Sequence, residues 1–329
     1  MPRGLCPSRG YDLNAPTNFP IADARDANSQ LVWLLGQPHL EDYLSFVKER
    51  VIGGDRIEPR VLTDEWRAAN DVYYELEQAE AGDADRIETK PIGKKLEALA
   101  AEVRANAHYR KTFDSLPTTI EMVELDRLLL WQSHVANRFA NVRGRALGAK
   151  PTPEELFRFC LPLDRDMPPV QIKQLGSDRY QFISPSTDLR AQEAMLLDPA
   201  QLSTIETYGP VAAAIGLVVG FSANFLSGIR SENRILLHNG YHRAYALRAL
   251  GITHAPCVIQ TVTRKDELAL LADARVASDP GFYFKAARPP MLRDFFNPAL
   301  RKHLLVRQID TVVEVQFSMK NTTTTEIMA

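Results

Sequence analysis

The feature that most constrains the fold of this chain is an abrupt change of pattern at Asn239-Gly240. The apolar run Ile235-Leu236-Leu237 predicts a buried strand, and the residues after Gly240 predict a helix that reaches Leu250 and ends at Gly251. Glycine permits the sharp turn that joins a strand directly to a helix. The first-turn N–H groups of that helix would face the corner, where the helix dipole favours an anion. Gly240 is therefore predicted to begin an anion-binding corner.

His242 and Arg243 stand in the predicted first turn. An arginine can hold two phosphate oxygens at once, and a histidine can donate or accept a proton near neutral pH. The pattern predicts a phosphate cradle without a Walker motif, with both side chains facing a solvated pocket. A purely structural alternative remains open. In it, the corner is only a helix cap, His242 bonds a neighbouring carbonyl and Arg243 pairs with a carboxylate.

Several predicted strands surround this corner. The pattern favours strands at 170–174 and 180–184 about a turn at 176–178, and at 217–229 and 234–237 about a turn at 231–233. A strand at 256–262, a helix at 265–276 and a final strand at 311–318 follow. The predicted order about the corner is strand, turn, strand, glycine corner, helix, strand.

The first half of the chain has helical spacing instead. Helices are predicted after Pro38, from Thr63 towards Gly82, over 94–107, from Thr118 past Val135, and from Thr152. Thr118 with Glu121 and Thr152 with Glu155 both have the spacing of a capping box. The sequence thus predicts an α+β protein with nearly all strands after Pro168. Its predicted parts are an extended N-terminal arm (1–30), a helical domain (31–162), an α/β domain with a small mixed sheet (163–320) and a disordered tail (321–329).

Composition narrows the classes of function. The formal net charge is −2, so nucleic acid would need a local basic patch, such as Arg138, Arg143, Arg145 and Lys150, which also complements a helix dipole. Three widely spaced cysteines are typical of a reducing compartment. The uncharged stretch 207–229 is broken by glycine, proline and polar residues, and the first 30 residues lack a signal-peptide core. We therefore expect a cytoplasmic protein without a membrane partner.

The run Leu237 to Gly251, followed by Ala255-Pro256-Cys257-Val258-Ile259, resembles the signature of the ParB/sulfiredoxin-like superfamily. The resemblance covers about residues 168–262, within the predicted α/β domain. In nucleotide-binding members this corner holds phosphates, which implies that role for Gly240, His242 and Arg243, with Asn239 and Tyr241 completing the corner.

The chain also departs from individual members of the superfamily. Sulfiredoxins carry their reactive cysteine where this chain has Tyr241, and serine kinases carry an acidic residue where it has Asn239. Partition proteins show Gly-Glu-Arg-Arg and a downstream helix-turn-helix, neither of which is evident here. The fold is therefore implied more strongly than any one activity.

The resemblance implies a nucleotide-binding protein, with ATP, ADP or CTP as the ligand and Mg²⁺ as an accompanying ion. Hydrolysis, phosphoryl transfer or a nuclease-type reaction would use His242 as acid or base. Asp188 is the preferred carboxylate and Arg190 a further phosphate ligand, because the pair follows the first predicted hairpin. The alternative is a non-enzymatic DNA-associated or protein-interaction module. In either case the helical half could form a lid or a partner surface.

Zinc ligands are another interpretation of the same region, because His238, His242, His254 and Cys257 lie close together in the sequence. Asn239-Gly240 breaks the helical phase between the first two. The other two lie beyond the far end of a helix about 15 Å long. No metal ligands are therefore predicted.

Overall fold

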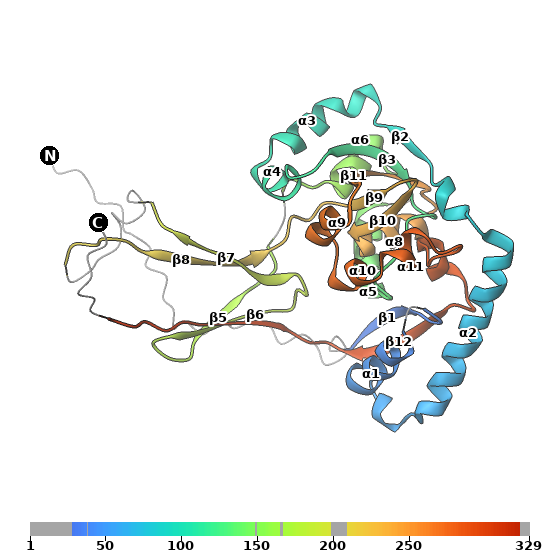
Figure 1. Ribbon diagram of the computed structural model, residues 1–329, viewed down its shortest axis with the longest axis horizontal. Coiled ribbons are helices and arrows are strands. Elements are labelled where there is room, and N and C mark those ends of the chain that lie inside the picture. The colour runs from blue at the N-terminus through green and yellow to red at the C-terminus, as the bar shows by residue number, and fades with distance from the viewer. Residues whose placement is uncertain (1–27, 38, 149, 165–166, 199–208, 323–329) are drawn as a thin grey trace. The chain divides into compact units, whose positions relative to one another are not determined.

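The computed structural model describes residues 28–37, 39–148, 150–164, 167–198 and 209–322 (Figure 1). The chain divides into two compact units. We call residues 24–165 and 223–308 the core unit, and residues 1–23, 166–222 and 309–329 the ribbon unit. Most of the predicted arm, residues 1–27, and most of the predicted tail, residues 323–329, lie outside the described residues.

A five-stranded mixed sheet carries the glycine corner. Its strand order is β10-β9-β11-β3-β2. The strands are β2 (Thr89–Pro91), β3 (Thr118–Glu124), β9 (Ser227–Ser231), β10 (Arg234–Asn239) and β11 (His254–Val262). β9 and β11 are parallel, and α8 (Tyr241–Ala249) connects β10 to β11. The predicted order of strand, turn, strand, corner, helix and strand is confirmed.

A second sheet of the core unit joins the two ends of the sequence. Its order is β12-β1-β4, with β1 (Asn28–Leu34) between β12 (Arg301–Arg307) and β4 (His134–Ala136). The expectation of an almost wholly helical region before residue 160 is therefore wrong, because β1, β2, β3 and β4 all lie there. Asn28, at the end of the predicted arm, already pairs with Arg307. The predicted α+β class is confirmed, because the structure contains both helices and mixed sheets.

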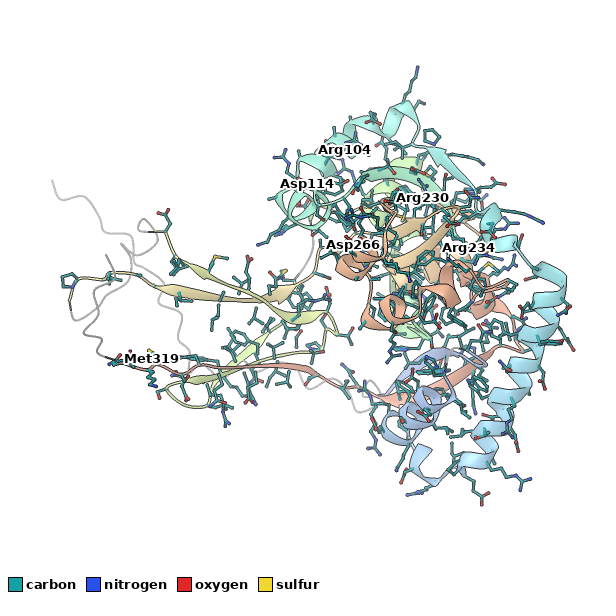
Figure 2. The ribbon with its side chains drawn as sticks, in the orientation of Figure 1. Arg104, Asp114, Arg230, Arg234, Asp266 and Met319 are labelled. Atoms are coloured by element: carbon teal, nitrogen blue, oxygen red, sulfur yellow. The ribbon has the colours of Figure 1, made fainter. Side chains whose placement is uncertain are left out.

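The segment 118–124 shows why the helical prediction failed. Thr118 and Glu121 do not form a capping box, because the Thr118 hydroxyl donates to the carbonyls of Phe113 and Leu116. Glu121 instead accepts two hydrogen bonds, at 3.0 and 2.6 Å, from Arg230 of β9 in the same sheet (Arg230 is labelled in Figure 2). β-Branched residues dominate this segment and favour a strand. Cross-strand pairing therefore outweighs the helical spacing.

The helices of the core unit agree better with the sequence. Thr152 and Glu155 form the predicted capping box of α6. The helix predicted from Thr63 begins earlier, at Pro59, and the one predicted over 265–276 is divided in two. The α-helices are α1 (Leu40–Arg50), α2 (Pro59–Glu80), α3 (Glu97–Ala105), α4 (Ala107–Phe113), α5 (Asn137–Leu147), α6 (Pro153–Cys160), α9 (Lys265–Leu271), α10 (Ala274–Ser278) and α11 (Pro280–Phe284). Short 3₁₀ turns are η2 (Gly54–Arg56), η3 (Asp83–Arg86), η4 (Lys94–Leu96) and η5 (Leu292–Phe296).

One hydrophobic core links both halves of the sequence within the core unit. Val32 of β1, Val123 of β3, Phe157 of α6, Leu247 of α8 and Phe295 of η5 belong to the same buried cluster. Residues 31–162 therefore share their core with residues 223–308. Burying both sets in one cluster fixes α8 against its neighbours.

The ribbon unit contains two small sheets. β13 (Thr311–Gln316), β6 (Arg179–Ser184) and β5 (Gln171–Gln174) form the first, in that order. β7 (Leu189–Leu196) and β8 (Ile215–Phe221) form an antiparallel pair. The strands predicted at 170–174, 180–184 and 311–318 are thus confirmed. The single strand predicted over 217–229 is instead divided between β8 and β9, which belong to different units. Among the described residues, the structure contains no helix with the length and apolarity needed to cross a membrane.

Candidate functional site

Gly240 forms the predicted corner between β10 and α8. Its φ is +95°, a left-handed conformation that glycine adopts without strain. A Cβ atom here would lie 2.6 Å from Leu226 Cδ1 and 3.2 Å from Leu226 Cα. Both the backbone angle and the close approach of Leu226 therefore require glycine.

Asn239 stabilises the corner from inside the protein. Its Nδ2 donates to the Ala223 carbonyl at 3.0 Å, and its Oδ1 accepts from the Gly240 N–H at 2.7 Å. Both ends of the amide are thus used in holding β10 to the segment before β9. Asn239, expected to bind the ligand, instead positions the corner.

Tyr241 is buried and supports a neighbouring loop. Its hydroxyl accepts from the Trp131 N–H at 3.1 Å and donates to the Leu237 carbonyl at 2.8 Å. Its ring meets that of Trp131 edge to face. Burial raises the pKa of the Tyr241 phenol well above its ordinary value, so the hydroxyl stays protonated. The contacts give Tyr241 a structural role rather than the expected ligand contact.

Arg243 does not border a solvated pocket, so this part of the prediction is wrong. Its side chain is only 2% exposed, and Nη1 donates to the Cys160 carbonyl at the end of α6, at 3.4 Å. Tyr241 and Ala244 of the same helix are also buried, so this side of α8 faces the protein interior. The charge of Arg243 therefore lies in the protein interior, close to the buried Cys160.

His242 is the half-buried side chain of the first turn. Burial first, and then electrostatic coupling to His134 and the positive charges of Arg143 and Arg243, lower the pKa of His242 to about 4. α5 brings Arg143 close because Gly144 packs against α8, where a Cβ would lie 3.8 Å from both Ala246 and Leu250. His242 therefore lies in a positive field at the N-terminus of α8.

His134 adds a second imidazole to this field. It lies on β4 and stacks on Trp33 of β1, with ring centroids 5.4 Å apart and planes 5° from parallel. Burial, followed by the charges of Arg50 and Arg275, lowers the pKa of His134 to about 4. Both histidines are therefore neutral at pH 7. We call His242, His134, Arg143, Arg50 and Arg275 the cationic cluster.

The sequence could identify only part of this cluster. His242 belongs to the motif, and Arg143 belongs to the basic end of a predicted helix. His134, Arg50 and Arg275 come from β4, α1 and α10, which are distant in sequence. The spacing of these residues gives no local signal, since only the tertiary fold brings His134 near His242 and the two arginines near His134.

Asp188 and Arg190 belong to the ribbon unit, whereas His242 belongs to the core unit. Asp188 Oδ1 accepts from Arg190 Nη2 at 2.6 Å and from the Ser222 hydroxyl at 2.5 Å. These bonds tie the start of β7 to the residue after β8. Asp188 and Arg190 thus belong to a different unit from the corner. Within the described ranges, no three His, Cys, Asp or Glu side chains gather where they could hold a metal ion.

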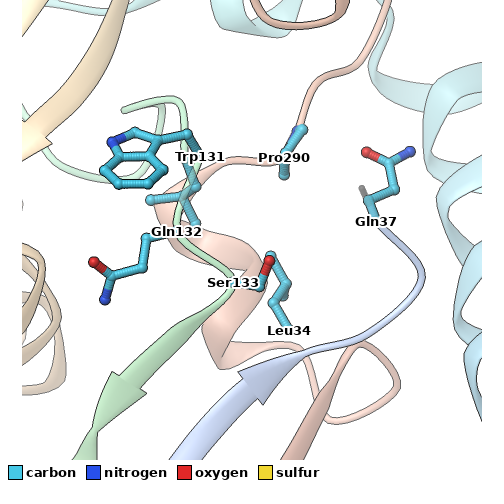
Figure 3. Close-up of a pocket in the computed structure, with 7 residues that line it drawn as sticks. Leu34, Gln37, Trp131, Gln132, Ser133 and Pro290 are labelled. Carbon is cyan, nitrogen blue, oxygen red and sulfur yellow. The ribbon is translucent and has the colours of Figure 1, made fainter. Parts of the chain in front are cut away.

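A narrow cleft lies beside the loop that Tyr241 supports (Figure 3). It has no room for a water molecule. Its lining residues are Leu34, Gln37, Leu130, Trp131, Gln132, Ser133 and Pro290. Ligand pockets usually hold about 300–1,000 Å³. The cleft is therefore too small for a nucleotide, and the corner remains the candidate site.

Comparisons with models of protein families, with curated proteins and with solved structures found no match. The assignment of a function therefore depends on the corner and the cationic cluster themselves.

Proposed function

We propose that the protein binds a phosphate-bearing ligand, of the nucleotide class, at the N-terminus of α8. One observation carries this proposal: the charges of Arg143 on α5 and Arg243 on α8 act on His242 in the first turn of α8, and those of Arg50 and Arg275 act on the neighbouring His134. A helix N-terminus attracts anions through its N–H groups and dipole. Added cationic side chains strengthen that preference.

The protonation state of the cluster suits a ligand that carries its own negative charge. His134 and His242 are neutral at pH 7 in the free protein, which limits repulsion within the cluster. A bound phosphate would raise the pKa of both imidazoles, because an opposite charge favours the protonated form. His242 would then donate to a phosphate oxygen, and Arg143 would supply a charge-assisted hydrogen bond.

The proposal further includes a chemical reaction of the bound nucleotide. His242 is the residue of the first turn that could transfer a proton in nucleotide hydrolysis or phosphoryl transfer. Mg²⁺ would enter with the nucleotide. The alternative, a non-enzymatic interaction or DNA-associated module, predicts no nucleotide affinity at the corner.

The first experiment is calorimetric titration of the full chain with ATP, ADP, CTP and GTP, each with and without Mg²⁺. We expect at least one nucleotide to bind in a one-to-one ratio. Failure of all four would contradict the proposal and favour the non-enzymatic alternative.

The second experiment compares two arginines of α5. Arg143→Ala should weaken nucleotide binding about ten- to a hundredfold, because a hydrogen bond to a charged group contributes about 1.5–3 kcal/mol. Arg145→Ala is the matched control, since Arg145 lies on the same helix and is exposed. It should change affinity less than about twofold, as expected for a screened surface charge. Equal losses in both variants would show only a general effect of net charge and would reject the cluster.

A further inference from the structure

The outer edge of β8 in the ribbon unit has unusual properties. β8 pairs with β7 on one side, and none of the other described strands pairs with its second edge. β7 is exposed along nearly its whole length. A two-stranded sheet is marginally stable in water by itself. Among the described residues, this sheet therefore has no third strand that would extend it at the outer edge of β8.

The side chains of the β7-β8 sheet are also strongly apolar. Leu196 is 74% exposed, Ile215 69% and Leu217 48%. β8 has the sequence Ile-Gly-Leu-Val-Val-Gly-Phe and carries no charged residue. Edge strands usually carry lysine, proline or a bulge that prevents pairing with another chain. The single register shift in this sheet falls opposite Val218, between Ala191 and Ala194 of β7, and leaves the outer edge of β8 regular.

We propose that two copies of this chain pair antiparallel through β8, forming a continuous sheet of order β7-β8-β8-β7 across a two-fold axis. The sequence of β8 matches itself in this arrangement. With Val218 on the axis, Leu217 lies opposite Val219 of the second copy, and Ile215 lies opposite Phe221. Gly216 then lies opposite Gly220. An isologous interface requires such reciprocal pairs.

The backbone hydrogen bonds permit the same register. The Leu197 N–H donates to the Ala214 carbonyl, so the polar groups of Ala214 and Gly216 face β7. Those of Ile215, Leu217 and Val219 consequently face the outer edge. Centring the pair on Val218 joins Leu217 to Val219, so outward-facing groups meet outward-facing groups. A register shifted by one residue would place the outward-facing groups of one copy opposite the inward-facing groups of the other.

The lack of charge along β8 supports a second copy as the occupant. No like charges meet along β8, since every residue from 207 to 229 is uncharged. A stable interface buries about 800 Å² per partner, more than one strand edge supplies. The exposed apolar side chains beside the edge (Met195, Leu196, Ile215 and Leu217) provide further area. The groove between β8 and the other sheet, lined by Tyr180, Phe182, Ile215, Leu217, Val315 and Phe317, extends this apolar surface.

The test begins with the mass of the full chain in solution, measured by light scattering over a wide range of protein concentration. The wild type should form a dimer, and Val218→Lys should form a monomer, because two lysines would meet on the axis. Val312→Lys is the matched control, since Val312 is an exposed valine of β13 in the same unit. It should remain dimeric, and circular dichroism should show that both variants are folded.

A cross-link checks the register independently of any effect on folding. In the background of Cys6→Ser, Val218→Cys should form an intermolecular disulfide under mild oxidation. Directly opposed residues whose backbone groups face away from each other lie about 4.5 Å apart at Cα, within disulfide range. Val312→Cys should not cross-link. A monomeric wild type, a dimer unaffected by Val218→Lys, or equal cross-linking at both positions would overturn the proposal.

Discussion

The three side chains that open α8 leave the helix in different directions, and this decides what each can do. Tyr241 and Arg243 are buried, whereas His242 is half-buried. The sequence predicted the corner correctly because Gly240 follows an apolar strand and precedes a helix. It could not distinguish His242 from Arg243, because that depends on where α6 ends against α8, at Cys160.

The burial of Arg243 changes the expected effect of removing it. Arg243→Ala should lower the free energy of unfolding by about 1–3 kcal/mol, because the buried Cys160 carbonyl loses its hydrogen-bond donor. Urea denaturation measures this change. Arg104→Ala is the control, because Arg104 makes an exposed ion pair with Glu97 and should cost less than about 1 kcal/mol.

A different result for Arg243→Ala would support the sequence-based prediction that Arg243 binds phosphate. If Arg243→Ala leaves stability unchanged but removes nucleotide affinity, Arg243 acts as a phosphate ligand. The conservative variant Arg243→Lys sharpens the comparison, since lysine keeps the charge but cannot reproduce the planar guanidinium.

At the scale of elements, a loop after β3 extends the five-stranded sheet beside β10. The Leu129 N–H donates to the Ile235 carbonyl, and the Leu237 N–H donates to the Leu129 carbonyl, both at 2.9 Å. Further along the loop, the Tyr241 hydroxyl accepts hydrogen bonds from the N–H groups of Trp131 and Gln132. One phenol thus connects β10, α8 and the loop that leads to His134.

Tyr241→Phe tests this connection. The variant keeps the ring but leaves the Trp131 N–H and the Leu237 carbonyl without their partner. We expect a loss of about 1–3 kcal/mol in unfolding free energy, the cost of an unsatisfied buried polar group. Tyr74→Phe, at an exposed position of α2, should change stability by less than about 0.5 kcal/mol. Equal stability of the wild type and Tyr241→Phe would show that the loop does not depend on this hydroxyl.

The strands of the first half show the limits of local pattern at this scale. Thr118 and Glu121 have the same spacing in a capping box and on a strand, so the spacing alone cannot decide. The partner decides: β11 lies more than 100 residues away and pairs with the whole of β3. Local pattern could not predict β1 either, because its partners β12 and β4 lie far along the chain. The corner and its helix were predictable because their determinants are adjacent in sequence.

Across the whole core unit, a network of ion pairs joins the C-terminal segment to α2 and η3. Arg288 donates to Asp294 at 2.7 Å and to Glu80 at 3.0 Å, and Arg293 donates to Asp83 at 2.6 Å. Arg288 and Asp294 are both buried. This network holds the segment before η5 against the N-terminal half of the sequence.

The cationic cluster predicts how global stability depends on pH. The pKa of His134 and of His242 is about 4 in the folded protein, against about 6.5 for an unfolded histidine. The unfolded chain therefore binds more protons between these pH values. Stability is complete above about pH 6.5 and falls as the pH is lowered towards 4. Each histidine should cost about 2 kcal/mol at pH 5.

Urea denaturation at pH 7.5 and pH 5 measures this dependence without ligand. Replacing either histidine by glutamine should reduce the difference between the two pH values. His108→Gln, at an exposed position, should leave the difference unchanged. A wild type that is equally stable at both pH values would contradict the neutral state of the two imidazoles.

The pairing of β1 with β12 has a consequence for how the chain is made. β1 is translated among the first residues of the core unit, whereas its partner over 301–307 is translated near the end. At synthesis rates of about 5–20 residues per second, β1 waits at least roughly a quarter of a minute for that partner. During this interval its apolar residues Leu31, Val32 and Trp33 have left the ribosome without the strand that buries them. The nascent chain is thus exposed to chaperones, and to neighbouring copies on the same messenger RNA, until the last strand of the core unit is released.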